Sequence, residues 1–231
     1  MPATALTRRS CLAQSAALCL GTWAAGPAQA RSTRRAVVIN MALEPDSLDP
    51  TMAAAAAVGE VTHYNVLEGL TRIEENGAVA PLLAESWSVD GTGRHYHLRL
   101  RQGVRFHDGA AFDAAAVRFS FERAVAPSAT NKARKALFDN IARIETPDAH
   151  TVVLALERPD VHLLFRLGEG PAVILHPASA AQASSHPVGT GPYKVVEYVP
   201  GKSILLEKNT EYFKDSPKVQ PKIGKVLIRF I

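Results

Sequence analysis

Residues 186–208, HPVGTGPYKVVEYVPGKSILLEK, constrain the fold more than any other part of this 231-residue chain. Two stretches rich in β-branched and aliphatic residues are separated by Pro200 and Gly201, a pair typical of a tight turn, so we expect a β-hairpin. A glycine turn precedes the first strand. We expect Gly189 and Gly191 to adopt positive φ angles, because one segment of the chain crosses another there.

The same glycine turn can be compared with a phosphate-binding loop. A loop of the Walker type needs Gly, four residues, Gly-Lys and then Ser or Thr, and it leads into a helix whose first amides face the anion. Residues 189–194, GTGPYK, lack that spacing and lead into a strand. Pro192 removes one donor amide and fixes the direction of the new strand. The pattern argues against nucleotide binding.

Residues 1–30 predict an export signal. Arg8 and Arg9 precede an uncharged run rich in alanine and leucine, and the small residues at 28–30, Ala-Gln-Ala, form an A-x-A cleavage site. The segment TRRSCL also resembles the twin-arginine export motif, with cysteine where that motif usually has phenylalanine. We expect a twin-arginine-like signal peptide over residues 1–30, with an ordinary secretion signal as the alternative. Glycine and proline at 26–27 break the apolar run, which argues against a permanent membrane helix.

The composition of the remaining chain excludes several classes of site. Both cysteines, Cys11 and Cys19, lie within residues 1–30, so a chain cleaved there has no disulfide, thiolate metal site or cysteine nucleophile. Cleavage also leaves 24 basic against 22 acidic residues, a formal charge of +2. The basic residues are dispersed and do not alternate with aromatic residues, so we expect no nucleic-acid partner.

The rest of the chain alternates predicted strands and helices, which indicates an α/β protein. A helix is predicted over 59–73, because Val61, Tyr64 and Leu70 recur at helical spacing. Asp113 stands where a helix N-cap is expected, ahead of an amphipathic run. The further expected elements are strands at 34–42, 151–156, 171–177 and 223–231, a helix within 131–144, and a short helix begun by Pro159.

Residues 87–106 predict a second hairpin. Asp90 and Gly91 form a turn signal, and the residues after them alternate between apolar and polar types. The alternation places Tyr96, Leu98 and Leu100 on one face and His95, His97, Arg99 and Arg101 on the other. His95 and His97 therefore share a face from which two imidazoles can chelate a metal. No third ligand is near in the sequence, so we predict no metal site.

His107 and Asp108 invite comparison with a catalytic dyad. Adjacent residues on a turn rarely aim at one substrate, and residues 31–231 offer no clear nucleophile elbow. We therefore predict no catalytic residue, no cofactor and no enzyme activity.

Three blocks of the sequence together resemble a known family. Residues 187–213, from PVGTGPYK to KNTEYF, are similar to the P-x-G-T-G-P-Y/F-K signature and following strands of the extracytoplasmic solute-binding proteins of family 5. These are the peptide, nickel and oligosaccharide receptors of ABC importers. Residues 83–125 resemble the family's L-A-x-S-W phrase, hairpin and F-H-D-G turn, and EPDSLDP at 44–50 resembles its first-strand exit. The departures from the family pattern are Ala116, Thr210 and Phe213.

The resemblance implies an α/β fold of the periplasmic binding protein-like class II, which is two-lobed in the family. It assigns residues 31–52 and 171–231 to an incomplete first lobe and 53–170 to an attached α/β subdomain, with the second lobe absent. It also implies a periplasmic substrate-binding component that delivers a small peptide or similar solute to ABC permease subunits in the inner membrane. The alternative is a truncated, non-transporting exported module that acts through protein–protein contact or is non-functional.

The resemblance places a loop that lines the ligand cleft at residues 51–60. The candidate ligand-binding residues there are Ala53, Ala54, Ala55, Ala56, Ala57 and Glu60. Small side chains leave volume for a bulky ligand and expose backbone groups whose hydrogen bonds do not depend on the ligand's side chains. The alternative interpretation of the alanine run is a helix start.

Arg134 is a further candidate ligand-binding residue, because nickel-chelate receptors of the family carry a pocket arginine in the helix that it is expected to occupy. The alternative is a solvated helix residue. Those receptors carry another arginine where this chain has Gly170, and this difference argues against nickel as the ligand.

Overall fold

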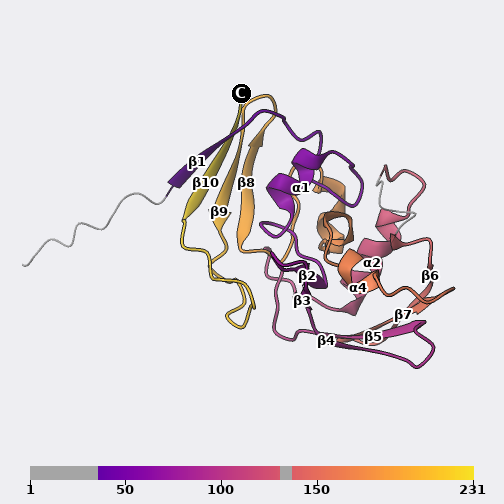
Figure 1. Ribbon diagram of the computed structural model, residues 1–231. Helices are drawn as coiled ribbons and strands as arrows, with labels where there is room; N and C mark the ends of the chain where they lie inside the picture. The colour runs from indigo at the N-terminus through magenta and orange to yellow at the C-terminus, as the bar shows by residue number, and fades with distance from the viewer. Residues whose placement is uncertain (1–35, 131–136) are drawn as a thin grey trace, which may run out of the picture. The chain divides into compact units, whose positions relative to one another are not determined.

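The computed structural model describes residues 36–130 and 137–231. The described strands form two four-stranded sheets and a two-stranded ribbon, so the α/β class is confirmed (Figure 1). Among the residues described, no helix has the length and hydropathy needed to cross a membrane. In chain order the elements are β1 (Ala36–Met41), α1 (Ala56–Thr62), β2 (Thr71–Ile73), β3 (Val79–Pro81), β4 (Ala84–Val89), β5 (His95–Leu100), α2 (Ala114–Ala124), β6 (Ile141–Asp148), β7 (Thr151–Leu156), α4 (Leu163–Arg166), η1 (Gly170–Ala172), η2 (Pro177–Gln182), β8 (Tyr193–Val199), β9 (Ser203–Lys208) and β10 (Lys225–Phe230).

One sheet, which we call the terminal sheet, has the strand order β1-β10-β9-β8. It joins the first described strand to the last, and Figure 1 shows indigo β1 beside yellow β10. β1 runs parallel to β10, whereas the other two pairs are antiparallel. The predicted hairpin between β8 and β9 is confirmed. Gly201 has a φ of 73° in its turn, a conformation that glycine adopts without steric cost.

The other four-stranded sheet, which we call the central sheet, has the order β4-β5-β7-β6 and is antiparallel throughout. The predicted alternation in β5 is confirmed, because its apolar residues are buried while His97 and Arg99 are exposed. The inner face packs against α2 through Val117 and Phe121. Asp113 caps this helix as predicted, with Oδ1 accepting a hydrogen bond from the backbone N of Ala116 at 3.0 Å.

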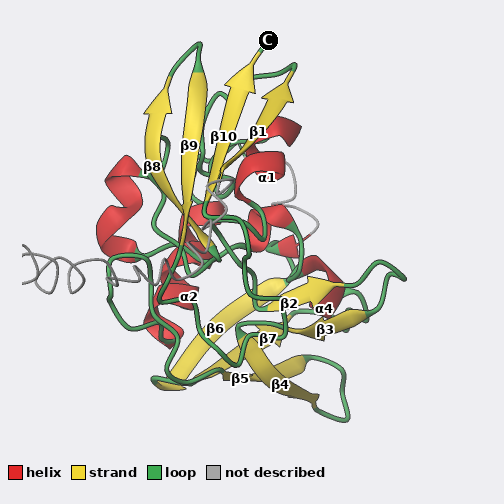
Figure 2. Ribbon diagram, turned by 90° about the vertical axis from the view of Figure 1, so that its left-hand side faces the viewer, coloured by secondary structure: helices red, strands yellow, loops and turns green. Residues whose placement is uncertain are grey.

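The buried apolar side chains of the described residues gather in two clusters. One lies between the central sheet and α2 and includes Leu98 and Phe121, and the other lies against the terminal sheet and includes Val61 and Ile204. Figure 2 shows the two sheets well separated, with α1 beside the terminal sheet and α2 beside the central one. Each fully buried aliphatic or phenylalanine side chain contributes about 1.5 to 3 kcal/mol relative to an exposed one. The expected division at residues 53 and 170 into a lobe and a subdomain stays a prediction.

The helix predicted over 59–73 is wrong in its extent. α1 ends at Thr62, whose Oγ1 donates to the carbonyl of Val58 at 2.6 Å, and Tyr64 has a φ of 60°. A left-handed tyrosine costs energy, which here is offset because its hydroxyl donates to the carbonyl of Gly168 at 2.7 Å and accepts from the amide of Ile73 at 3.0 Å. The apolar spacing that resembled one helix runs from the end of α1 through an irregular segment to β2, and its buried residues pack into both clusters.

Three other predicted elements differ from the structure, at least where their residues are described. The helix expected within 131–144 falls partly on residues 131–136, outside the described residues, and β6 already begins at Ile141. The strand expected at 171–177 is replaced by the short 3₁₀ helices η1 and η2 around an isolated bridge at Ile174. The short helix expected at Pro159 begins only at Leu163. Proline-rich segments favour tight turns over regular ladders, because proline donates no backbone hydrogen bond.

The prediction of positive φ angles at Gly189 and Gly191 is also wrong. Neither glycine is among the described residues with positive φ. Their role is close approach: a Cβ added to Gly189 would lie 2.2 Å from the carbonyl oxygen of Val66, and one on Gly191 would lie 2.5 Å from that of Asn65. The amide of Gly191 donates to the Val66 carbonyl at 3.1 Å. The chain does cross another segment here, and glycine is needed because a side chain would not fit between the two backbones.

Candidate functional site

The predicted ligand-contacting alanines lie between β1 and the first turn of α1. Ala53 and Ala54 are partly buried in the loop, whereas Ala55 and Ala56 are exposed. Helix α1 begins at Ala56, so the helix-start interpretation holds for Ala56 and Ala57, and the three alanines before them are loop residues. The loop therefore presents methyl groups and backbone to solvent at Ala55 and Ala56. Their contact with a ligand stays a prediction.

Glu60 lies on the open side of α1. The helix buries Ala57, Val58 and Val61, of which Val61 packs into the cluster at the terminal sheet, whereas Glu60 is exposed. Glu60 also borders a cavity of about 360 Å³ between α1 and the terminal sheet. The residues that line this cavity are Ile39, Met41, Glu60, Asn65, Tyr193, Leu206, Ile223, Val226 and Ile228.

The predicted site residues differ in whether they line this cavity. Its lining is mainly aliphatic, with Glu60 as its carboxylate, and the alanines at 53–57 do not line it. The structure thus brings Glu60 to a cavity that Ala55 and Ala56 do not line. Arg134 lies outside the described residues. Sequence reasoning did not identify the cavity, because its walls come from strands more than 150 residues apart.

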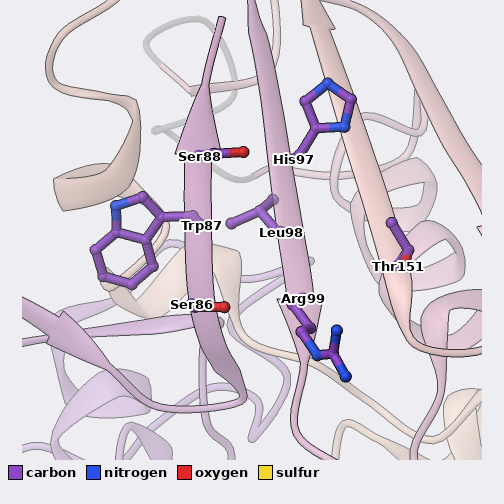
Figure 3. Close-up of a pocket in the computed structure, with 7 residues that line it drawn as sticks. All are labelled: Ser86, Trp87, Ser88, His97, Leu98, Arg99 and Thr151. Carbon is purple, nitrogen blue, oxygen red and sulfur yellow. The ribbon is translucent and has the colours of Figure 1, made fainter.

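A second hollow, of about 240 Å³, lies on the outer face of the central sheet. Figure 3 shows Ser86, Ser88, His97 and Arg99 pointing to one side, with Trp87 on the other. Arg99 forms an ion pair with Glu85, Nε to Oε1, at 2.7 Å. The hollow is polar and open, and its charged arginine is already paired, so it suits solvent more than an apolar ligand.

The two histidines considered as metal ligands differ in their surroundings. His95 Nδ1 lies 2.7 Å from Asp90 Oδ2, which uses one of its ring nitrogens, whereas His97 belongs to the open polar hollow. Hydrogen bonds from His95 and Thr92 hold the pKa of the Asp90 carboxyl well below its usual range. Within 36–130 and 137–231, no three His, Cys, Asp or Glu side chains are grouped so that they could hold a metal ion.

His107 joins two of the motifs identified in the sequence. Its backbone N donates to the carbonyl of Gly189 at 2.9 Å, its Nε2 donates to the carbonyl of Gly191 at 2.9 Å, and its Nδ1 accepts from the amide of Gly189 at 3.4 Å. Burial lowers the pKa of His107 to about 4, so the ring is neutral, as an accepting Nδ1 requires. The neighbouring Asp108 instead pairs with His176, Nδ1 to Oδ2 at 2.6 Å. The residues compared with a dyad therefore make separate structural contacts.

Glu68 organises a buried polar network that sequence reasoning missed. Its side chain is 0% exposed and accepts hydrogen bonds from Thr190 Oγ1 at 2.9 Å, Tyr212 Oη at 2.7 Å and Lys218 Nζ at 3.0 Å. Burial raises the pKa of Glu68 and lowers that of Lys218. Lys218 also donates to the carbonyl of Tyr64. The network ties the glycine turn and the segment before β10 to the segment after α1.

Two comparisons by sequence place the chain among known proteins. The profile of the family described as bacterial extracellular solute-binding proteins, family 5 Middle, matches residues 78–231. A curated relative, the glutathione-binding protein GsiB of Pectobacterium atrosepticum, is 34% identical over 172 residues, which cover 73% of this chain and 33% of the relative. The match thus spans about a third of that relative's length.

Solved structures agree with the sequence comparisons. The binding protein AgaA from A. tumefaciens R10, in complex with agropinic acid, superposes with a TM-score of 0.76 and 30% identity over 85% of this chain and 40% of that one. The periplasmic binding protein DppA from Helicobacter pylori, in complex with the peptide STSA, gives a TM-score of 0.75 and 27% identity over 85% and 42% of the two chains. The fold is that of the periplasmic binding proteins of this family, and the chain belongs to the bacterial extracellular solute-binding proteins, family 5.

Proposed function

We propose that the protein is a periplasmic solute-binding component of an ABC importer and that its solute is a small peptide or a peptide-like molecule. The observation that carries the proposal is the family match together with 34% identity to a protein named for binding glutathione, which is itself a tripeptide. The peptide STSA held by DppA supports the same solute class. The protein passes its solute to permease subunits in the inner membrane and catalyses no reaction.

The loop at 51–55 and the exposed side of α1 support a site for such a solute. Ala55 and Ala56 leave space and present backbone, which suits ligands with varied side chains. Glu60, one turn along α1, supplies an exposed carboxylate that suits an ammonium group. We therefore propose these three residues as solute contacts, with Ala53, Ala54, Ala57 and Arg134 as the other members of the site.

The proposal is tested by calorimetry on the full chain with reduced glutathione and with the tetrapeptide Ser-Thr-Ser-Ala. We expect Ala55→Phe to weaken binding by about tenfold or more, since a bulky ring fills the proposed contact surface and tenfold corresponds to about 1.4 kcal/mol. Ala142→Phe is the matched control, because Ala142 is an exposed alanine of β6. Binding of a nickel–histidine chelate without binding of either peptide would overturn the peptide assignment.

We further propose that residues 1–30 direct export through the twin-arginine route. These residues lie outside the described part of the chain, and the support for this route is the sequence motif with Arg8 and Arg9. Replacing both arginines by lysine should stop export, because a general secretion signal needs only positive charge whereas the twin-arginine motif needs the arginines themselves. Undiminished export of the doubly substituted protein, measured in periplasmic fractions, would identify the ordinary secretion route.

A further inference from the structure

Asp49 is a buried carboxylate at the start of the loop that carries the candidate site. Its Oδ1 accepts hydrogen bonds from the backbone N of Thr51 at 3.0 Å and from Thr51 Oγ1 at 2.6 Å. Its backbone carbonyl accepts from the amides of Met52 at 3.2 Å and Ala53 at 2.9 Å. The amides of residues 51–53 thus all bond to Asp49. The turn that they form sets the direction in which the loop continues towards α1.

Arg123, in the last turn of α2, supports Asp49 from the other side. Its Nε and Nη2 both donate to Asp49 Oδ2, at 3.1 and 2.7 Å, and Nη2 also donates to the carbonyl of Ala180 in η2 at 3.2 Å. The Asp49 side chain is 2% exposed and that of Arg123 is 25% exposed. A charge-assisted bond shielded from water is stronger than a surface ion pair, and removing one partner leaves a buried charge uncompensated.

Thr130 provides a second anchor from the segment that follows α2. Its backbone N and its Oγ1 both donate to the carbonyl of Met52, at 2.9 and 2.6 Å. The loop is therefore held at Asp49 and at Met52 by residues 74 and 78 positions further along the chain. Both anchors come from α2 or the residues just after it, so the conformation of the loop depends on that helix.

We propose that Arg123 is a positioning residue, which acts through Asp49 to hold residues 51–55 in the conformation that contacts the solute. Arg123 does not touch the solute itself. Without Arg123 the loop samples several conformations. The apparent affinity for the solute then falls in proportion to the fraction of molecules whose loop is in the binding conformation. The link to solute affinity rests on the proposed function, whereas the effect on loop conformation does not.

The first experiment measures hydrogen–deuterium exchange of the full chain without any solute. We expect Arg123→Ala to speed exchange of the amides of residues 51–53 by about tenfold or more, because these amides are protected by the bonds to Asp49. Arg123→Lys keeps the charge and one donor group, so it should restore part of the protection. Arg118→Ala is the matched control, since Arg118 lies on the same helix and bonds to the carbonyl of Ile144 instead. Amides of β5 report whether a variant is destabilised as a whole.

The second experiment measures glutathione binding by calorimetry for the same variants. We expect Arg123→Ala to weaken binding by about tenfold and Arg118→Ala to change it by less than about twofold, while β5 exchange is unchanged in both. Unchanged exchange at 51–53 in Arg123→Ala would overturn the proposal, as would an equal rise in all amides. Faster loop exchange with unchanged affinity would overturn the link to the solute. If the unsubstituted chain does not bind glutathione, the proposed solute fails, and the exchange result alone decides the positioning role.

Discussion

The terminal and central sheets have the same number of strands, but they differ in which parts of the chain pair to form them. The central sheet is built from neighbouring hairpins, buries one face under α2 and turns polar side chains outward. The terminal sheet pairs the first described strand with the last, and β1 leaves Val37, Val38 and Ile39 exposed to 39%, 52% and 45%. Local hairpins thus supply two of the three strand pairs of the central sheet, and β5 and β7 join them. The terminal sheet contains one local hairpin, β8–β9, and is completed by the pairing of β1 with β10 from distant segments.

This difference has a physical basis in how each sheet forms. An antiparallel hairpin closes a short loop, and its alternating pattern directs one face to the core. A parallel pair needs a long connection, so the entropy of closing that connection is offset only when the intervening structure has folded. An uncharged, apolar edge strand such as β1 is typical of a surface on which further chain packs. Three predictions test the comparison.

The largest effect is expected from the core of the central sheet. Phe121→Ala removes a buried ring that packs against Phe138, and it should lower the free energy of unfolding by about 3 to 5 kcal/mol. The matched change on the terminal sheet, Ile39→Ala, removes a side chain that is already half exposed and should cost less than about 1 kcal/mol. Urea unfolding measures both. Equal losses would show that the β1 edge is buried in solution.

The next effect concerns the network that ties the terminal sheet to the rest of the molecule. Glu68→Gln leaves the ammonium of Lys218 without its buried carboxylate and should destabilise the protein by about 3 kcal/mol. Glu207→Gln is the control, because Glu207 pairs with Lys225 on the surface and should matter by less than about 1 kcal/mol. Chemical denaturation distinguishes the two. A small loss in Glu68→Gln would mean that the network contributes little to the junction.

The smallest effect per step is a dependence of the stability on pH, which involves two histidines at the junctions between the sheets and accumulates over more than one pH unit. Burial lowers the pKa of His63 and His107 to about 4, from an ordinary value of 6.5. Between pH 6.5 and pH 4 the unfolded chain therefore binds protons that the folded chain does not. The free energy of unfolding has its full value above pH 6.5 and falls towards pH 4 by up to about 1.4 kcal/mol per histidine per pH unit. Imidazole proton shifts in NMR titrations report both groups. A midpoint near 6.5 for His107 would contradict its assigned role between the two glycines.

Much of the fold follows from patterns that act over short distances. The alternation of Tyr96 and Leu98, the cap at Asp113 and the turn at Gly201 each depend on a few adjacent residues, and the structure has all three. The predicted helix over 59–73 fails because Tyr64 adopts a left-handed conformation, which bonds to Gly168 and Ile73 stabilise. Apolar spacing in a sequence does not reveal hydrogen bonds to distant residues that stabilise such a conformation.

The candidate site also has features that the sequence predicts and features that depend on contacts between distant residues. The resemblance predicts that the loop at 51–60 contacts the solute, and the structure places Glu60 on the open side of α1 beside an apolar cavity. The support of the loop by Arg123 was not predicted, because its pairing with Asp49 joins residues 74 positions apart. A lone arginine in a helix carries no signal of its partner in the sequence.

By itself, the sequence determined the family, the hairpins and the capped helix, because these depend on short motifs and local spacing. For the glycines at 189 and 191 it predicted positive φ angles, which they do not adopt. The tertiary structure alone decided why those glycines are needed, which is the approach of the chain to Val66 at a distance that no Cβ tolerates. It also decided which charges are buried together, as in Glu68 with Lys218 and Asp49 with Arg123. Such contacts are set by the packing of distant segments, and local patterns contain no information about that packing.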